Sequence, residues 1–513
     1  MASEIHVQCP TFRTIRNENL FYADKTDYIH RLIGDRRTKI LCRPFGFGKT
    51  LLIDTLEELF RGNRALFKGL KIDSTDYQFE KHPVIRLNLN ITGPIDSRAL
   101  NARILNDLQK IAKAESLPLG QINPHLPLED VIFNLYRKYN PRSLESNPED
   151  DDGSRDQAKV VVLIDDYDAP VLNNLNNPAL AQDLQKTLYS FYRSFQNLEQ
   201  YCRFILLTGQ TKLGSGWNGA NINHIADISY QSEYAGICGF THADMDRLTA
   251  DQFETTAPAL ILKHQFRLGQ SVDDLKQAIF HWYNGYIFDG STIFDEKARD
   301  KIVKVLNPFS ILSFFANQAF GNYWINAQDV DFLSRIVAKK PERFIGDDFS
   351  GYSQLSLTQL ENPPMGPLLF QTGYLTLKEV SVSHGLMSYN FKVPNLEVSL
   401  GYRVAILEKI FNLNTIEEIQ NTQRKVEKSL SSHNQVDWEA AFAMAVALLT
   451  FRPPRPGDFF YRIVFQLFIY CLGFEIHPED PPGFNRLELV QELFVSKKAR
   501  EGVQNLISEP FLP

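Results

Sequence analysis

The chain has 513 residues with a net charge of −7, and 43% of its residues are hydrophobic and 22% are charged. This composition is typical of a globular protein and excludes a largely disordered chain. The length predicts about two to four domains at roughly 150 residues each. The acidic balance gives no support to a nucleic-acid partner, which would need a local basic groove.

The cysteines and the most apolar segment bear on where the protein resides. Five cysteines are scattered singly, without a C-x-x-C pair, and predict reduced thiols in an intracellular protein, cytoplasmic or nuclear. The start MASEIHVQCP lacks the basic and apolar regions of a secretory signal. The late stretch FFYRIVFQLFIYCLGF is interrupted by Arg462 and Gln466 and falls short of the ~20 residues that span a bilayer. We expect a buried helix there and no membrane partner.

Strands and helices are predicted to alternate in the first part of the chain. Four nearly continuous apolar segments read as buried parallel strands: KILCR (39–43), PVIRLNLNI (83–91), KVVVLIDD (159–166) and CRFILLTG (202–209). Helical patterns lie between them, as where Leu52, Leu56 and Leu59 recur at spacings of four and three. This alternation predicts a doubly wound α/β domain from about residue 20 to 235. Residues 144–157 are acidic and predict a solvated insertion before the third strand.

The remaining sequence predicts further units. Helical, aromatic-rich patterns begin after about residue 236, strand-like alternation suggests a small β element around 367–398, and helical patterns dominate again from about 402. The expected domains are therefore 1–235 (α/β domain), 236–400 (helical lid or second domain with a small β element) and 401–513 (helical C-terminal region).

Residues 38–50, TKILCRPFGFGKT, end like a phosphate-binding loop, although the spacing G-x-x-x-x-G-K-[ST] has Arg43 in place of its first glycine. Gly46 and Gly48 would let backbone N–H groups approach phosphate, and the helix that follows would direct its N-terminus at the charge. Lys49 would reach the β and γ phosphates, and Thr50 would complete a Mg²⁺ shell. The residues assigned to nucleotide binding are Arg43, Pro44, Phe45, Gly46, Phe47, Gly48, Lys49, Thr50 and Leu51.

Polar residues at two further strand ends are candidate catalytic groups. Asp165 and Asp166 follow a buried apolar run, where the first acid would hold Mg²⁺ and the second would orient or activate water. The alternative is that these aspartates cap a helix or start a turn. Thr208 ends another strand and would sense the γ-phosphate, or it would only satisfy backbone groups.

Short motifs occur in order between about residues 10 and 400: FYADKTDYI, RPFGFGKTLL, VLIDDYDAPVL, LLTGQTKL, YNGYIF, LNPFSIL, NYW, LLFQTGYLTL and VPNLEV. This set resembles the AAA-ATPase-like family, in which a P-loop ATPase domain is frequently followed by a PD-(D/E)XK-type nuclease domain. The resemblance implies an α/β fold: a P-loop NTPase (AAA/ASCE-like) parallel sheet, a mainly helical lid and a small α+β C-terminal region. It also implies ATP and Mg²⁺ as cofactors.

Two positions depart from the family pattern. The family loop typically reads R-P-R-R-F-G-K-S, which already begins with arginine and proline, but here Gly46 replaces a basic residue. The usual IDEYD is IDDYD, so Asp166 stands where the family has a glutamate, on a side chain one methylene shorter. A carboxylate drawn back by ~1 Å would position water poorly, so we expect slow hydrolysis.

The C-terminal end bears on nuclease activity. A nuclease of that fold needs an acid at one strand end and E-x-K on the next strand, which together hold Mg²⁺. Here Glu488 takes the acid's place in GFNRLELV, but the following LFVSKK lacks the glutamate. Glu488, Glu492 and Lys497 could regroup as a metal site, or they belong to a solvated amphipathic end. We interpret this end as a truncated or degenerate nuclease remnant.

Three functions remain open at this point. The first is an ATP-binding P-loop ATPase with slow hydrolysis, in which the nucleotide moves the helical lid against the α/β core. The second is an ATP-gated, Mg²⁺-dependent nuclease, of the mobile-element or defence type that the resemblance implies. The third is a non-catalytic interaction module that nucleotide stabilises. AAA-type enzymes often complete their sites with an arginine from a neighbouring subunit, so a homo-oligomer is also open.

Overall fold

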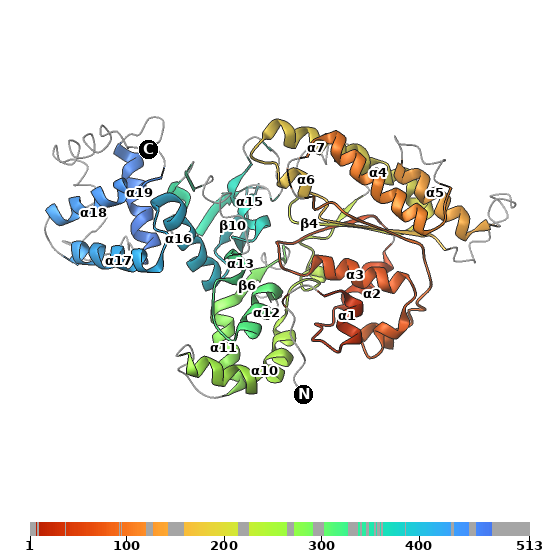
Figure 1. Cartoon of the computed structure of the whole chain (residues 1–513), viewed down its shortest axis with the longest axis horizontal. Coiled ribbons are helices and arrows are strands. Elements are labelled where there is room, and N and C mark those ends of the chain that lie inside the picture. Colours follow the sequence, from red (N-terminus) through yellow and green to blue (C-terminus); the bar gives the residue numbers. More distant parts are fainter. Residues whose placement is uncertain are drawn as a thin grey trace. The chain divides into compact units, whose positions relative to one another are not determined.

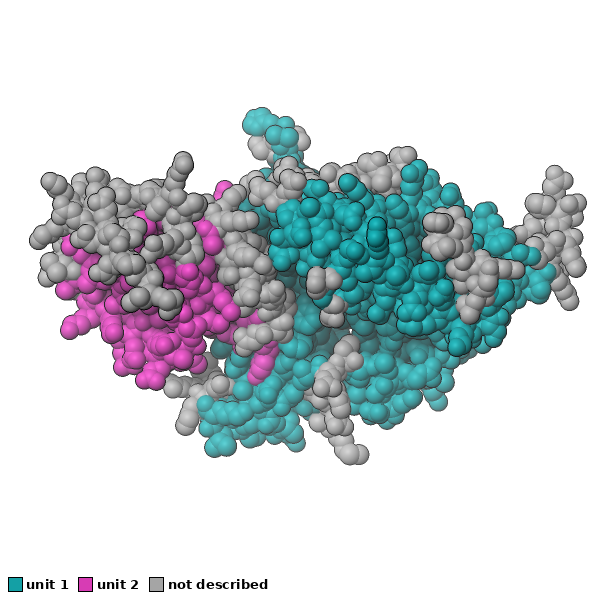
Figure 2. Space-filling view, turned by 45° about the horizontal axis from the view of Figure 1, so that its top comes forward, with its two compact units in different colours: residues 1–321, 350–395 teal, residues 322–349, 396–513 magenta. Residues whose placement is uncertain are grey.

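The computed structural model is divided into two compact units, Met1–Gly321 with Ser350–Asn395 and Asn322–Phe349 with Leu396–Pro513, coloured separately in Figure 2. The division into three domains stays a prediction. The structure describes residues 7, 10–35, 37–91, 93, 95–118, 127–141, 158–213, 225–263, 271–290, 302–326, 337–338, 341–344, 348–352, 355, 360, 363–384, 386–431, 435–450 and 458–474. The acidic segment 144–157 lies outside these residues.

A parallel five-stranded sheet forms the centre of the first unit. Its strands follow the order β2-β3-β4-β1-β5. Every residue of β3 is buried, as expected of an apolar parallel strand that is covered on both faces. Four strands match the predicted segments, whereas β5 has only two residues and no apolar run that would have predicted it. The strands are β1 (Lys39–Cys42), β2 (Val84–Asn88), β3 (Val160–Asp165), β4 (Cys202–Gly209) and β5 (Ala226–Asp227).

Helices cover both faces of this sheet. The helix α3 packs on one face against β2, β3 and β4, whereas α4 and α5 contact β2 and β3 from the other (Figure 1). This arrangement confirms the predicted α/β class. The helices around the sheet are α1 (Phe12–Asn17), α2 (Thr26–Gly34), α3 (Lys49–Phe60), α4 (Ser97–Ala114), α5 (Pro127–Tyr139), α6 (Ala169–Leu172), α7 (Pro178–Arg193) and α8 (Phe195–Leu198), with 3₁₀ turns η1 (Arg64–Phe67), η2 (Lys71–Ser74), η6 (Glu199–Tyr201) and η7 (Ser232–Tyr234).

The strand register places the candidate polar residues at one edge of the sheet. Asn88 on β2 lies beside Asp165 on β3, and Thr208 on β4 lies beside Leu41 on β1. Because the strands are parallel, their carboxyl ends share this edge with the loop that follows β1. Open parallel sheets bind ligands outside these carboxyl ends.

The rest of the first unit combines helices with short antiparallel strands. One prediction is corrected here: residues 365–372 form a fully buried helix rather than a strand, since periodicity cannot separate a short apolar strand from a buried helix. The predicted β element is confirmed by β9 and β10. The elements are α10 (His242–Leu262), α11 (Val272–Tyr283), β6 (Asn284–Ile287), β7 (Lys304–Leu306), α12 (Pro308–Asn317), α15 (Met365–Thr372), β9 (Thr376–Ser383) and β10 (Leu386–Lys392).

The second unit is helical. Its helix α13 packs on α16, where the buried backbone N–H of Trp324 donates a 2.7 Å hydrogen bond to Glu397. Its elements are α13 (Tyr323–Asn326), η10 (Pro341–Phe344), α16 (Leu396–Phe411), α17 (Ile416–Ser431), α18 (Gln435–Ala447) and α19 (Asp458–Cys471), and β8 (Asp348–Tyr352) crosses the boundary between the units. The expected helix at the late apolar stretch is α19.

Three predictions from the sequence concern a membrane span, the cysteines and the C-terminal acids. Within them, no helix is long and apolar enough to cross a membrane. The described cysteines, Cys42, Cys202, Cys238 and Cys471, are free and buried. Glu488, Glu492 and Lys497, on which the nuclease hypothesis rests, lie outside the described residues.

Candidate functional site

The loop between β1 and α3 has the backbone of an anion-binding turn. Gly46 and Gly48 adopt φ angles of +83° and +91°, in the left-handed region that favours glycine. Gly48 is also the N-cap of α3 and has no side chain to cap it. The first N–H groups of a helix have no partner within the helix, so those of α3 remain for another acceptor.

Three consecutive carbonyls of this loop are held by a distant part of the chain. The side-chain amide of Asn307 donates to the Phe45 carbonyl at 3.1 Å. The backbone N–H of Phe309 donates to the Gly46 carbonyl at 3.3 Å, and that of Gly239 to the Phe47 carbonyl at 2.9 Å. The loop is thus tied to the segments just before α10 and at the start of α12.

These contacts determine where the loop's N–H groups point. In a trans peptide unit the C=O and N–H bonds point in opposite directions. The N–H groups of Gly46, Phe47 and Gly48 therefore each point away from the donor that holds the preceding carbonyl. Among the described residues, these three groups have no hydrogen-bond acceptor. Successive free N–H groups that alternate with left-handed residues form an anion-binding concavity.

Lys49 lies across the first part of the loop. Its ammonium group is nearly buried and donates to the carbonyls of Arg43 and Pro44, at 3.0 and 3.1 Å. Thr50 and Leu51 follow it on α3, and all three residues line the same cavity. Lys49 thus lies at the start of α3 and lines the cavity, with its ammonium group held by two carbonyls of the loop.

Arg43 is not brought to the cavity. Its side chain is 1% exposed and donates to the carbonyls of Ser229 and Tyr234, the latter at 3.0 Å. Its guanidinium carbon lies 4.4 Å from the centre of the Phe288 ring. Burial lowers the Arg43 pKa from its usual range. Neither Arg43 nor Pro44 lines the cavity, so Arg43 supports the loop from within the protein.

Asp165 and Thr208 form a buried pair at the sheet edge. Both side chains are fully buried, and the Thr208 hydroxyl donates to Oδ1 of Asp165 at 2.7 Å. Asn88 approaches Oδ2 of Asp165 at 3.5 Å. Thr208 does not line the cavity, and the structure instead places it where it orients the Asp165 carboxylate.

Asp166 lines the cavity and has a perturbed acidity. Burial, with the nearby Asp165 and Asp168 carboxylates, raises the pKa of Asp166 from its ordinary 3.8 to about 6. Lys49 and a hydrogen bond from Asn90 act in the opposite direction. Asp166 has φ +51°, a left-handed conformation that aspartate adopts more readily than most residues.

Sequence reasoning missed the part played by Asp168. This buried carboxylate accepts hydrogen bonds from the backbone N–H groups of Gln210 and Thr211 and from the Thr211 hydroxyl. It therefore holds the turn after β4 against the turn after β3. Its signal in the sequence was the third acid in IDDYD, which the assignment of Asp165 and Asp166 left unused.

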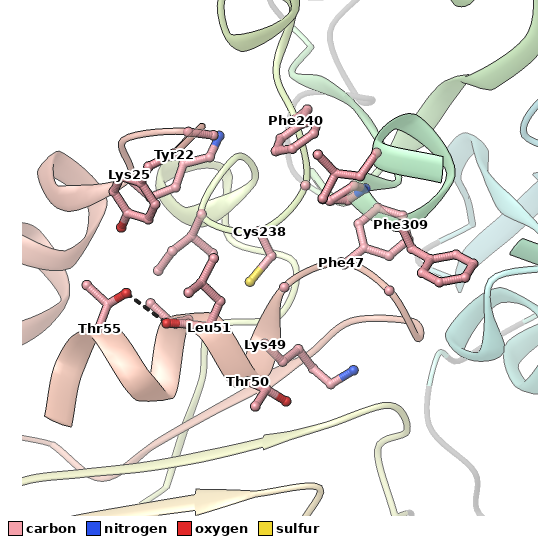
Figure 3. A pocket seen from close by; sticks show the side chains of 18 of the residues that line it. Tyr22, Lys25, Phe47, Lys49, Thr50, Leu51, Thr55, Cys238, Phe240 and Phe309 are labelled. Atoms are coloured by element: carbon pink, nitrogen blue, oxygen red, sulfur yellow. Dashed lines mark hydrogen bonds between the residues drawn. The ribbon is translucent and has the colours of Figure 1, made fainter. Parts of the chain in front are cut away.

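A cavity of about 390 Å³ lies over the loop and α3. Figure 3 shows Tyr22, Lys25, Phe240 and Phe309 around it, with Lys49 and Thr50 at the start of α3. One part is apolar and the other polar. The apolar lining includes Ile29, Leu51, Leu52, Ile237, Cys238 and Phe240, and the polar lining includes Lys49, Asn88, Asn90, Asp166 and Gln210. A ligand with an apolar ring and a polyanionic tail would fit both parts.

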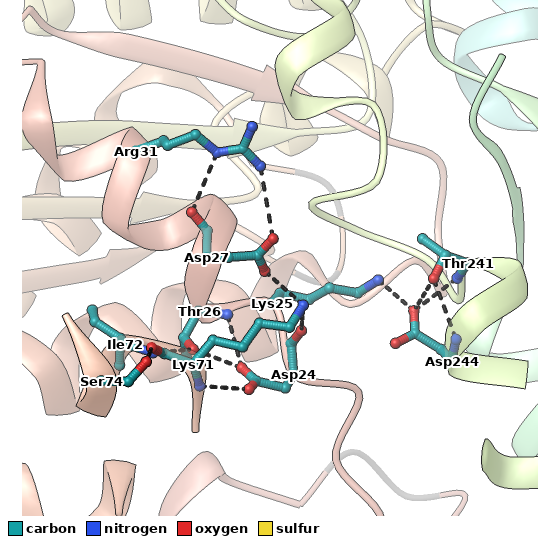
Figure 4. A network of polar contacts seen from close by, with 10 residues as sticks. All are labelled: Asp24, Lys25, Thr26, Asp27, Arg31, Lys71, Ile72, Ser74, Thr241 and Asp244. Carbon is teal, nitrogen blue, oxygen red and sulfur yellow. Dashed lines mark hydrogen bonds and ion pairs between the residues drawn. The ribbon is translucent and has the colours of Figure 1, made fainter. Parts of the chain in front are cut away.

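Lys25 connects this cavity to α10. Its ammonium group pairs with Asp244 at 2.6 Å, and both side chains are largely buried (Figure 4). The same Asp244 oxygen accepts from the N–H and hydroxyl of Thr241, which completes a capping box at the start of α10. The motif FYADKTDYI, quoted above without a role, thus supplies a lining residue that is held by a partner 219 positions away.

The described residues also show which side chains are available to bind Mg²⁺. Among them, no group of three or more His, Cys, Asp or Glu side chains is arranged so that it could hold a metal ion. Mg²⁺ usually takes only one or two protein carboxylates and otherwise binds phosphate oxygens and water. Asp165 and Thr50 would suit that mode.

Two comparisons show what this chain is similar to. A protein of Azotobacter chroococcum mcd 1, described as "Uncharacterized protein in vnfD 5'region", is 26% identical over 495 residues, which is 93% of this chain and 85% of the relative. Residues 6–215 match the model of a family described as "Predicted AAA-ATPase". The match contains the loop, Asp165, Asp166 and Thr208 but ends before Asn307. Over residues 6–215 this chain is therefore similar to the AAA-ATPase-like family.

Proposed function

We propose that this protein binds ATP with Mg²⁺ and hydrolyses it slowly. The observation that carries the proposal is the loop of residues 43–48, followed by Lys49, in which three successive N–H groups have no acceptor among the described residues. Such a loop suits the oxygens of a polyphosphate. The family of residues 6–215 supports ATP as the nucleotide.

Each residue has a part in this proposal. Lys49 would leave the two loop carbonyls and bind the phosphates, and the N–H groups of Gly46, Phe47 and Gly48 would hold phosphate oxygens. Thr50 and Asp165 would hold Mg²⁺, which when bound neutralises charge on the phosphate oxygens. We assign Arg43 a structural part, and Thr208 acts through Asp165.

Asp166 would orient the attacking water and accept its proton. With a pKa of about 6, its carboxylate is mostly ionised at neutral pH, as a base must be. It is one methylene shorter than the glutamate usual in the family, so the water would be held less closely and turnover would be slow.

Nucleotide binding would also join two parts of the chain. The cavity is lined by α3 and the N-terminal segment as well as by residues 237–240 and 308–312. A ligand that contacts both would change their mutual packing, which supports the proposed conformational switch. The homo-oligomer remains a prediction from the sequence, and a nucleic-acid partner has no support from the net charge of −7.

The test is Mg·ATP binding by calorimetry and by thermal shift, with Lys49→Ala against wild type. Removal of the ammonium group should weaken binding about tenfold to a hundredfold, since hydrogen bonds to charged groups contribute that much. Lys110→Ala, on the exposed face of α4, is the matched control and should bind normally. A wild-type protein without a nucleotide-dependent shift would refute the proposal. Binding without phosphate release would instead favour the interaction module.

A further inference from the structure

Asn307 makes two hydrogen bonds that serve different purposes. Its Oδ1 accepts from the Phe309 N–H at 2.9 Å and caps α12. Its Nδ2 donates to the Phe45 carbonyl in the phosphate loop at 3.1 Å. The side chain is 1% exposed, so both bonds are made away from water. These partners settle the orientation of the amide, because a carbonyl can only accept and an N–H can only donate.

Helix capping alone does not explain an asparagine at this position. Serine, threonine and aspartate cap helices about as well, because a cap needs only an acceptor. Asparagine differs from them in adding amide donors at the end of a side chain long enough to reach the loop. The donor at position 307 is therefore used for the Phe45 carbonyl.

The geometry of Gly46 shows how closely this contact is made. A Cβ atom on Gly46 would lie 2.8 Å from Oδ1 of Asn307 and 3.0 Å from Cβ of Phe309. The loop and the first residues of α12 thus pack without room for a side chain. Rotation of the Phe45–Gly46 peptide unit would break the bond to Asn307 and turn the Gly46 N–H out of line with those of Phe47 and Gly48.

We propose that Asn307 is a positioning residue for phosphate binding: its amide holds the Phe45–Gly46 peptide so that the loop's N–H groups are arranged for a polyphosphate before the ligand arrives. This inference rests on the proposed nucleotide function. It places a determinant of phosphate affinity 262 residues from the loop, outside the segment that the family model matches. Asn307 acts through preorganisation, because donors that are already fixed in place need no reordering when the ligand binds.

The test uses Asn307→Ser, which keeps a capping oxygen and loses the reach to Phe45. The probes are Mg·ATP and inorganic tripolyphosphate with Mg²⁺, with affinities measured by calorimetry well below the unfolding temperature. Loss of one hydrogen bond should weaken both probes by the same factor, about fivefold to tenfold. An equal loss of affinity for both probes would place the effect at the phosphates, which the two probes share. A general loss of stability would not single out the phosphates.

Asn177→Ser is the matched control. Asn177 caps α7 through its side chain and is followed by proline, as Asn307 is, but it lies away from the cavity. Its replacement should leave both affinities unchanged. Asn307→Asp keeps the size and the cap but turns a carboxylate toward the Phe45 carbonyl, so it should weaken tripolyphosphate binding more than serine does. It serves as the second variant if the serine protein does not fold.

The outcomes separate the two proposals. Wild-type protein that binds neither probe refutes the nucleotide function and this inference with it. Wild-type protein that binds both, with an Asn307→Ser protein that binds them equally well, overturns the part assigned to Asn307 alone. A loss for ATP without a loss for tripolyphosphate would also overturn it.

Discussion

The hydroxyl of Thr208 donates a 2.7 Å hydrogen bond to Oδ1 of Asp165, so the residue near the end of β4 orients the carboxylate that ends β3. Both side chains are fully buried. The two therefore act as one unit, and the part of Thr208 in the proposed site is to position the acid that would hold Mg²⁺.

The first prediction concerns this pair. Thr208→Val keeps the shape of the side chain and removes its hydroxyl. It should raise the Mg²⁺ concentration needed for half-maximal ATP binding several-fold and lower the free energy of unfolding by about 1 to 3 kcal/mol, because the buried carboxylate loses a donor. Thr208→Ser keeps the donor and should resemble wild type in a Mg²⁺ titration. An unchanged Mg²⁺ requirement in the valine protein would refute the positioning role.

The second prediction concerns the acidity of Asp166. Its pKa is about 6 in the folded protein and near 3.8 when unfolded, so the unfolded chain gives up its proton first as pH rises. The contribution of Asp166 to the free energy of unfolding is complete below pH 3.8 and is lost as the pH rises through about 6. Asp166→Asn does not titrate and should gain stability relative to wild type over that range, by about 3 kcal/mol at most. Urea unfolding at pH 4, 5, 6 and 7 checks this, and a constant difference would contradict it.

The third prediction concerns the reach of the same side chain. Asp166→Glu extends the carboxylate by one methylene and should raise the rate of phosphate release, while ATP affinity stays unchanged. Stability should fall slightly, by less than about 1 kcal/mol, because glutamate tolerates a left-handed backbone less well than aspartate. Steady-state phosphate release measures the rate, with Asp166→Asn as the inactive reference. No gain in rate would show that carboxylate reach does not limit turnover.

The fourth prediction separates two parts that Arg43 could play. The buried guanidinium donates to three backbone carbonyls and stacks on Phe288, which a lysine cannot reproduce. Arg43→Lys should lower the free energy of unfolding by about 2 kcal/mol or more, with ATP affinity within about threefold of wild type. Arg103→Lys, on the exposed side of α4, is the control. A large loss of ATP affinity with an unchanged free energy of unfolding would show instead that Arg43 takes part in nucleotide binding.

The fifth prediction concerns the ion pair between Lys25 and Asp244. Lys25→Met leaves a largely buried carboxylate without its cation, whereas Lys25→Met with Asp244→Asn removes both charges. A double-mutant cycle in urea should give a coupling of about 1 to 2 kcal/mol. The exposed pair Lys110 and Asp107 in α4 provides the comparison and should couple by less than about 1 kcal/mol. Equal coupling in the two pairs would contradict a special contribution from Lys25.

Local patterns predicted much of this protein. The four longer strands of the sheet, the glycine-bearing loop after β1 and the acids at the end of β3 could be recognised because strand character, turn glycines and strand-end carboxylates are each encoded within a few neighbouring residues. The order of β1, the loop and α3 follows from the same local signals. The helix α15 could not be told from a strand, because its eight residues are all buried and show no amphipathic period.

The sequence by itself thus determined the elements and the residue types at the sheet edge. Only the tertiary structure decided which side chains meet there. It turned Arg43 into the interior, set Thr208 on Asp165, joined Lys25 to Asp244 and brought Asn307 to the loop carbonyl of Phe45. Such contacts join residues up to 262 positions apart, and they depend on how buried surfaces pack together rather than on any pattern within one segment.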